Sequence, residues 1–301
     1  MNAISKSETT SPKKPDSRQE QRAAQRAANE DRARKMHAAR METALDCLPG
    51  LEAESRVEEP PALNVGCSGW YYREWKGKFY PESIPSGRWF DHYADQFQTV
   101  ELNAPFYSWP TVDTVKTWLR QAGPRRFVYT VKVCELITHV KRFRDTGELV
   151  EDFGYIATLL EEHMGCFLFQ MPPGYDFTAD RLKRILSQLD PARRNVVEFR
   201  HPSWWNEKVY DAFRETGAIF CSCSAPGLPD EMVNTSGEVY LRFHGATKWY
   251  LYNYSTAELE RWRDRVIRSG ARRVWAYFNN TMDGSAVDNA RQFRDLCLAG
   301  S

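Results

Sequence analysis

The chain has 301 residues, of which 42% are hydrophobic, 13% aromatic and 27% charged, which is typical of a folded globular protein with one large or two average domains. Its 41 lysines and arginines nearly balance 40 aspartates and glutamates, so no strong overall charge attracts nucleic acids or acidic membranes. We find no apolar run of ~18–20 residues, no secretory signal and no C-x-x-C pair among seven cysteines, which predicts a cytoplasmic protein that is neither a membrane protein, a disulfide scaffold nor a zinc ribbon.

The N-terminal segment differs in composition from the rest of the chain. Residues 1–40 carry ten lysines and arginines but five acidic residues, and residues 1–60 contain no aromatic side chain. Such a segment buries little apolar surface, so we expect 1–60 to be a solvated extension, disordered or partly helical, with helix formers from Gln19 to Leu48. A basic arm for an anionic surface is the alternative interpretation. Two consecutive prolines end the extension, and the ordered domain is expected over 63–301.

From there, strand-like and helix-like patterns alternate along the chain. Eight runs rich in β-branched and aromatic residues predict strands at 63–69, 99–106, 126–133, 166–172, 195–200, 218–224, 239–245 and 272–279. Amphipathic stretches predict helices at 86–97, 111–122, 150–164, 178–190, 206–217, 255–269 and 285–298. Prolines and glycines in 225–238 leave the sixth helix degenerate.

This alternation predicts a single α/β domain, a (β/α)8 or TIM barrel, since such barrels have about 250 residues. An open, doubly wound sheet is the structural alternative. That fold normally carries a glycine-rich phosphate loop, and the sequence has no G-x-G-x-x-G motif.

Polar residues of one parity lie late in six of the predicted strands. Alternate side chains of a barrel strand point into the lumen, and the carboxyl ends of the strands form the rim where barrel enzymes build active sites. The residues of this parity are Glu101, Asn103, Thr130, Lys132, Gln170, Glu198, Arg200, Arg242, His244, Tyr277 and Asn279. Burying so many ionisable groups is costly unless they are paired or serve a ligand. The cluster is therefore either a catalytic centre or a structural salt-bridge network.

Aromatic residues are concentrated in three loops at the predicted rim. They occur in 70–81, 201–205 and 249–254. Aromatic faces beside a polar cleft suit a sugar ring or a nucleobase, and Trp204 and Tyr252 are the candidates that follow charged strands. The alternative is that these rings pack the loops onto the barrel.

The motifs VGCSGWYYREWKGKFYP, ELNAPFY, TVK…TH, FQMPP, EFRHPSW, YLRFHG and AYFNN occur in this order. Over residues 63–298 the sequence resembles the YecE-like family, known as domain of unknown function 72. The resemblance implies a (β/α)8 barrel but supplies no reaction. The residues that match the family's motif positions are Glu101, Asn103, Tyr107, Lys132, His139, Gln170, Glu198, Arg200, His201, Trp204, Arg242, His244, Asn279 and Asn280.

We interpret two carboxylates in unlike surroundings as a division of acid and base work. Glu198 is expected to be ionised beside Arg200, and Glu101, among amide groups, to exchange a proton. His244 is a second acid–base candidate, because imidazole titrates near neutrality.

The cationic side chains suggest an anionic substrate. Lys132, Arg200 and Arg242 are expected to bind a phosphate or carboxylate, and Lys132 is alternatively a Schiff-base lysine. The predicted reaction is hydrolysis, isomerisation or elimination on a sugar-like or phosphorylated small molecule. The remaining expected substrate-binding residues are Asn103, Tyr107, His139, Gln170, His201, Trp204, Tyr252, Asn279 and Asn280.

Three other interpretations stay open. No cofactor is predicted, but a divalent metal bound by residues among His139, His201, His244, Glu101 and Glu198 is a less favoured alternative, because the nearby lysine and arginines repel a cation. A second is a non-catalytic barrel that binds a nucleotide or RNA with help from the basic extension. A third is an interaction protein whose lumen is filled by its own side chains.

Overall fold

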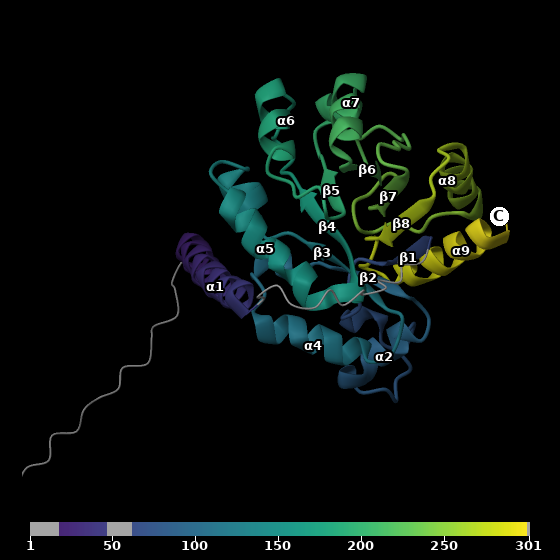
Figure 1. Cartoon of the computed structure of the whole chain (residues 1–301). Helices are drawn as coiled ribbons and strands as arrows, with labels where there is room; N and C mark the ends of the chain where they lie inside the picture. The colour runs from purple at the N-terminus through teal and green to yellow at the C-terminus, as the bar shows by residue number, and fades with distance from the viewer. Residues whose placement is uncertain (1–17, 47–61, 300–301) are drawn as a thin grey trace, which may run out of the picture.

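The computed structural model describes residues 18–46 and 62–299, and eight parallel strands surrounded by helices form its centre (Figure 1). The strands are β1 (Leu63–Cys67), β2 (Thr99–Leu102), β3 (Val128–Lys132), β4 (Met164–Gln170), β5 (Asn195–Glu198), β6 (Ile219–Ser224), β7 (Glu238–Phe243) and β8 (Arg273–Phe278). The sheet order is β1-β8-β7-β6-β5-β4-β3-β2. Each strand coincides with a predicted run, so the (β/α)8 barrel is confirmed.

Helices alternate with the strands and cover the outside of the barrel (Figure 1). They are α2 (Trp89–Ala94), α4 (Val112–Ala122), α5 (Gly147–Leu160), α6 (Ala179–Leu186), α7 (Glu207–Thr216), α8 (Thr256–Arg268) and α9 (Ser285–Ala299). Side chains of Thr111, Thr178, Asn206 and Ser255 accept a backbone hydrogen bond at the start of α4, α6, α7 and α8. Residues 225–238 form a loop, so the prediction of a degenerate sixth helix is confirmed.

Two short helices at the barrel mouth were not predicted from the sequence. The run predicted as a strand over 99–106 ends at Leu102, and α3 (Ala104–Tyr107) follows it. Pro105 lies in the first turn of α3, where a backbone N–H has no acceptor within the helix, so proline costs no hydrogen bond there. A π-helix, η3 (Leu136–Lys141), follows β3 in the same way.

The barrel closes between β1 and β2, the two ends of the hydrogen-bonded strand order. The Tyr93 hydroxyl lies between them, accepting from the Cys67 amide (2.8 Å) and donating to the Thr99 carbonyl (2.9 Å). A side chain at Gly66 would overlap the Thr99 carbonyl, so glycine is needed for this close approach. The Tyr93 hydroxyl thus takes the place of a backbone hydrogen bond between β1 and β2.

The predicted alternation of side chains divides the apolar residues into two layers. Outward-facing Phe199, Phe243 and Phe278 pack beneath the helices. Inward-facing residues such as Cys221 and Trp275 belong to a separate apolar cluster that fills the lumen. Polar side chains lie above this inner cluster, towards the carboxyl ends of the strands.

The N-terminal segment contains a long helix, α1 (Arg18–Asp46), which lies beside α5 (Figure 1). The expectation of a partly helical extension is confirmed, but the expectation that it is solvated is wrong along one face. Asn29, Ala33 and Met36 are buried there, because the barrel supplies the apolar surface that the helix lacks. Among the described residues, no helix combines the length and apolar character needed to cross a bilayer.

Candidate functional site

The polar residues predicted for the lumen meet at the carboxyl ends of the strands. Glu101 lies in β2, Glu198 in β5 and Arg242 in β7, and His244 follows β7 directly. All four are 0% exposed. Charged groups from three strands therefore meet inside the barrel rather than among the outer helices.

Arg242 bridges the two carboxylates. Its Nη1 lies 2.5 Å from Glu198 Oε2, and its Nη2 lies 2.5 Å from Glu101 Oε1. Burial alone would lower the pKa of Arg242, but Glu101 and Glu198 outweigh burial and raise it well above its usual value. Because the guanidinium is bound to both carboxylates at the base of the mouth, the anion-binding role predicted for Arg242 is not supported.

Glu101 lies among hydroxyl groups rather than the expected amides. Ser68 Oγ and the Tyr240 hydroxyl each donate to it at 2.6 Å, in addition to Arg242. Three donors on one carboxyl group are the arrangement expected around a carboxylate. This geometry favours a structural role for Glu101 over the predicted proton exchange.

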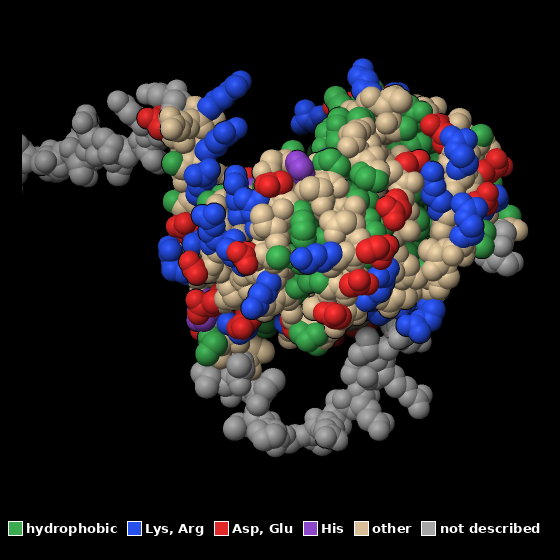
Figure 2. Space-filling model, turned by 90° about the horizontal axis from the view of Figure 1, so that it is seen from above, with side chains coloured by type: hydrophobic (Ala, Val, Ile, Leu, Met, Phe, Trp, Pro, Cys, Tyr) green, Lys and Arg blue, Asp and Glu red, His purple; other side chains and the backbone are tan. Residues whose placement is uncertain are grey.

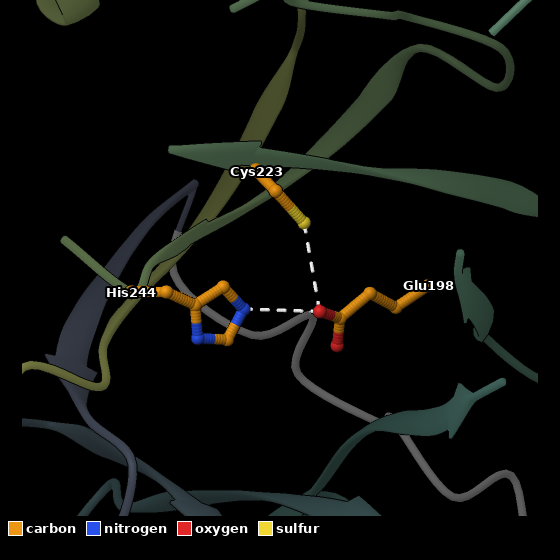
Figure 3. Close-up of side chains that lie close together, drawn as sticks. All are labelled: Glu198, Cys223 and His244. Atoms are coloured by element: carbon orange, nitrogen blue, oxygen red, sulfur yellow. Dashed lines mark hydrogen bonds and ion pairs between the residues drawn. The ribbon is translucent and has the colours of Figure 1, made fainter. Parts of the chain in front are cut away.

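Glu198 is the centre of the polar cluster. Its Oε1 lies 2.5 Å from Arg200 Nε, 3.0 Å from His244 Nε2 and 3.6 Å from the Cys223 thiol, the last two of which point at the carboxylate from neighbouring elements (Figure 3). Burial raises the pKa of Glu198, but Arg200, Arg242 and His244 together hold it well below its usual range. The expectation that Glu198 is ionised therefore agrees with its surroundings.

His244 is held in one orientation by groups on both sides of its ring. Burial and the two guanidinium groups of Arg200 and Arg242 keep its pKa well below the usual value, so the ring is neutral. The Asn279 amide nitrogen lies 3.1 Å from Nδ1, while Nε2 lies 3.0 Å from Glu198 Oε1 and 3.2 Å from Arg200 Nη2. Both ring nitrogens are therefore engaged by neighbouring groups of the network.

Lys132 is the cationic residue of the site without a counter-ion. It is 8% exposed, and its Nζ lies 4.1 Å from the centre of the Phe106 ring. Within the described part of the chain, it has neither a hydrogen bond nor an ion pair. Burial and the positive charge of Arg242 lower the pKa of Lys132 to about 7, despite attraction by Glu198 and Glu101.

Arg200 and His139 line the entrance beside Lys132. The Arg200 side chain is 8% exposed, and its guanidinium lies 4.5 Å from the centre of the Trp249 ring. His139, on η3, packs edge-on against Phe106 at 4.9 Å. Burial and the Lys132 charge lower the pKa of His139 to about 4, so this ring is also neutral at pH 7.

The predicted amide groups lie near the cluster but bond mainly to backbone. Gln170 donates to the Met171 carbonyl (2.7 Å), and Asn103 donates to the Ser68 carbonyl (3.3 Å). The buried Asn103 Oδ1 accepts no hydrogen bond from the residues that the structure describes. A ligand donor near this oxygen would satisfy it.

The two aromatic residues singled out from the sequence do not lie at the site. Trp204 is fully buried and stacks on Phe199 with ring centres 3.8 Å apart, on the outer side of β5. Tyr252 donates to Glu258 in the first turn of α8. Both are therefore packed as loop supports, which was the alternative interpretation of these rings.

Three other expected ligand-binding residues lie apart from the cluster. His201 bonds to the Ser203 hydroxyl in a short turn, and Asn280 donates to Asn289 of α9. The Tyr107 side chain is 62% exposed on the rim. The structure gives His201 and Asn280 local structural bonds, whereas Tyr107 remains open to an incoming ligand.

The donor atoms of Glu198, Cys223 and His244 lie within 4.8 Å of one another, a distance and composition that match a zinc site. The same carboxylate already contacts two guanidinium groups, Arg200 and Arg242, at 2.5 Å. A divalent cation would face both positive charges, so the donor set does not favour a metal. Of the metal ligands considered from the sequence, His139, His201 and Glu101 lie outside this set.

Sequence patterns missed several contacts of the site. Cys223, Ser68 and Tyr240 bond to the two carboxylates, while Phe106 and Trp249 flank the cations. Cys223 shares the inward parity of Cys221 in β6, a signal that was available but was overlooked because the run is apolar. The ring contacts come from irregular loops, where no periodicity predicts orientation.

Comparison with known proteins places the barrel in one family. A family model described as "Protein of unknown function DUF72" matches residues 64–300. The UPF0759 protein YunF of Bacillus subtilis (strain 168) is 26% identical over 273 residues, covering 78% of this chain and 94% of YunF. The resemblance found in the sequence is thereby confirmed, and α1 lies outside the matched residues.

Solved structures agree on the fold. A DUF72 family protein from Thermotoga maritima MSB8 is 30% identical, with a TM-score of 0.70 over 78% of this chain and 99% of that one. Another, from Enterococcus faecalis V583, is 20% identical, with a TM-score of 0.65 over 78% and 95% of the two chains. These relatives support the barrel and carry no description of a reaction.

Proposed function

We propose that this chain, which belongs to the DUF72 family, is an enzyme that uses the Lys132 amine to take a proton from a small anionic molecule at the barrel mouth. The observation that carries the proposal is a buried lysine with a pKa of about 7 and no counter-ion among the described residues. Such an amine is about half uncharged at neutral pH, as a general base requires.

Charge counting explains why Lys132 is poised in this way. The carboxylates of Glu101 and Glu198 are matched by the guanidinium groups of Arg200 and Arg242. Burial is the main cause of the lowered pKa, and this network, already neutral overall, supplies no net negative charge to offset the desolvation of the lysine ammonium. The carboxylate–arginine network thus acts as a fixed frame, and the lysine as the group free to change protonation state.

An anionic ligand fits this arrangement. A negative charge entering beside Lys132 and Arg200 would stabilise the lysine ammonium that forms when the amine accepts a proton. The partly exposed ring of Trp249, which lies against Arg200, offers an apolar surface for a sugar-like molecule. The site therefore suits a small, anionic, partly apolar substrate.

Among the three reaction classes considered, isomerisation and elimination fit better than hydrolysis. A hydrolase of the two-carboxylate type needs an acid and a base that are free to exchange protons. Here Arg242 binds both Glu101 and Glu198. Abstraction of a proton by Lys132 does not require either carboxylate to gain or lose a proton. The neutral amine would also add to a carbonyl, and reductive trapping with cyanoborohydride would reveal that route as added mass on Lys132.

The test is competitive acylation of the folded, full-length chain across a pH series, with labelling of each lysine read by peptide mass spectrometry. Lys132 is expected to gain reactivity with a midpoint near pH 7, following its pKa of about 7. Exposed Lys116 in α4 serves as the internal reference for reagent decay. A midpoint for Lys132 near the ordinary lysine value would remove the proposed base.

A further inference from the structure

Helix α1 is fixed to the barrel at a defined rotation. Gln25 Nε2 and Asn29 Nδ2 both donate to the Tyr107 carbonyl, at 2.9 and 3.1 Å, and Asn29 Oδ1 accepts from the Trp109 amide at 3.0 Å. About three turns further on, Arg40 donates to the buried Asp152 at 2.8 Å. One face of the helix therefore faces the barrel along its length.

The same face continues beyond the barrel as a pair of cations. Arg22 and Arg18 precede Gln25 by three and seven residues, so at about 3.6 residues per turn they lie on the contact face of α1. Both are exposed, and neither forms an ion pair with another described residue. With a rise of about 1.5 Å per residue, they extend about 5 and 10 Å past Gln25.

Within the described residues of α1, no acidic side chain falls on this end of the contact face. Glu20, Glu30 and Asp31 fall on other sides of the helix by the same periodicity. Figure 2 shows Lys and Arg side chains at the upper left of the molecule, across an open gap from the main body. The contact face thus changes from a barrel-binding surface to a positively charged one above the rim.

These cations lie close to the candidate site. Gln25 is bonded to the Tyr107 carbonyl, and the neighbouring Phe106 ring covers the Lys132 amine. Tyr107 is 62% exposed, and its carbonyl binds Gln25, which lies one helical turn from Arg22. α1 also contacts η3, which carries His139. A ligand leaving the barrel mouth on this side would pass an open aromatic ring and then two arginines.

We propose that Arg18 and Arg22 bind backbone phosphates of a single-stranded nucleic acid whose end enters the barrel mouth. Arginine and an exposed aromatic ring in one path are the combination that binds single strands, through phosphate contacts and base stacking. The small anionic molecule of the proposed function would then be the terminal unit of the strand. This inference deepens the proposed function, on which it rests for the identity of the mouth as the reacting end.

The test measures binding of fluorescein-labelled single strands of about ten nucleotides to the full chain by anisotropy, over a series of salt concentrations. Oligouridylate and oligothymidylate are compared, because they separate RNA from DNA. The double variant Arg18→Gln, Arg22→Gln is compared with Arg34→Gln, Lys35→Gln. The control removes two charges from α1, on the side that pairs with Asp31 instead of facing the mouth.

Wild type and the control are expected to bind alike, and the Arg18, Arg22 variant roughly tenfold more weakly at low salt. Its slope of log affinity against log salt should be shallower by about 1.4, the value for two phosphate contacts to a single strand. Tyr107→Ala, which keeps the carbonyl that holds α1, is expected to cost roughly tenfold through lost stacking.

Equal losses in the two double variants, or no binding by wild type at low salt, would overturn the inference. Binding to vesicles of phosphatidylserine and phosphatidylcholine in equal parts, without binding to strands, would instead assign the arginines to a membrane surface. The two measurements address different elements, because the proposed phosphate contacts lie on α1 and the proposed base lies on β3. Strand binding therefore tests this inference even where the acylation test fails.

Discussion

Burial of the Lys132 amine lowers the stability of the fold at neutral pH, and the same burial gives the amine its low pKa. A buried amine with a pKa of about 7, against about 10.5 in an unfolded chain, binds fewer protons when folded throughout the range between these values. Where the unfolded state binds more protons, stability rises with pH. Groups that a fold holds at such a cost are concentrated at functional sites.

We therefore predict that Lys132→Met is more stable than wild type at pH 7. Wild type should gain about 2 kcal/mol of unfolding free energy between pH 7 and pH 9, and the variant should lack this gain. Urea unfolding at the two pH values measures both. Lys116→Met, at an exposed position of α4, is the control and should keep the wild-type slope. A wild-type slope retained by Lys132→Met would mean that another group is responsible.

At the level of single residues, the sequence predicted the lumen well and the loops poorly. Glu101, Glu198 and Arg242 were identified because strand alternation leaves two directions for a side chain, and the outer one must be apolar. Trp204 was misinterpreted because it follows a strand in an irregular turn, where nothing in the sequence indicates that it stacks on Phe199. The sequence also did not predict that both carboxylates pair with one arginine, because that conclusion requires interatomic distances.

Among the elements, the junction of β1 and β2 depends on one side chain. The Tyr93 hydroxyl satisfies the Cys67 amide and the Thr99 carbonyl, both buried. Removing the hydroxyl leaves a buried donor and a buried acceptor without a partner, which typically costs about 1–3 kcal/mol. The closure of the barrel therefore depends on the hydroxyl oxygen of Tyr93, which lies on α2 outside the sheet.

Tyr93→Phe is expected to lose about 1–3 kcal/mol in urea unfolding and to speed hydrogen exchange at the Cys67 amide. Tyr71→Phe removes a hydroxyl from a ring that is 56% exposed, and should change neither quantity appreciably. Unchanged exchange at Cys67 in the Tyr93 variant would show that backbone packing alone closes the barrel.

Element boundaries were predicted within a few residues except at the mouth. Capping residues such as Ser255 indicate where α8 begins, and its capping box is present in the structure. By contrast, α3 and η3 are short, and their backbones serve the rim rather than the core. Periodicity over so few residues carries little signal, so the segments that shape the site were the ones missed.

For the whole molecule, the structure shows where the basic N-terminal segment lies relative to the barrel. The extension was expected to be a solvated segment because its own composition cannot form a core. That argument considers only the composition of the segment and leaves out the surface of α5, against which the helix packs. Ala33 and Met36 are 3% and 2% exposed against the barrel, so the basic helix has a fixed position beside the mouth. The family model matches residues 64–300, so this helix lies outside the matched part of the chain.

The docking of α1 can be separated from its helical content by two matched substitutions. Ala33→Asp places a charge in the buried contact, whereas Ala38→Asp places the same charge on the exposed side. Burying an unpaired carboxylate is unfavourable, so Ala33→Asp should detach the helix. Trypsin should then cleave at the arginines of α1 roughly tenfold faster in Ala33→Asp than in Ala38→Asp, as judged by timed mass spectrometry. Because the unfolding midpoint of the barrel depends on its own core, it should fall much less than this protection does. Equal cleavage in both variants would mean that α1 does not depend on this contact, and the cations it carries would then have no fixed relation to the site.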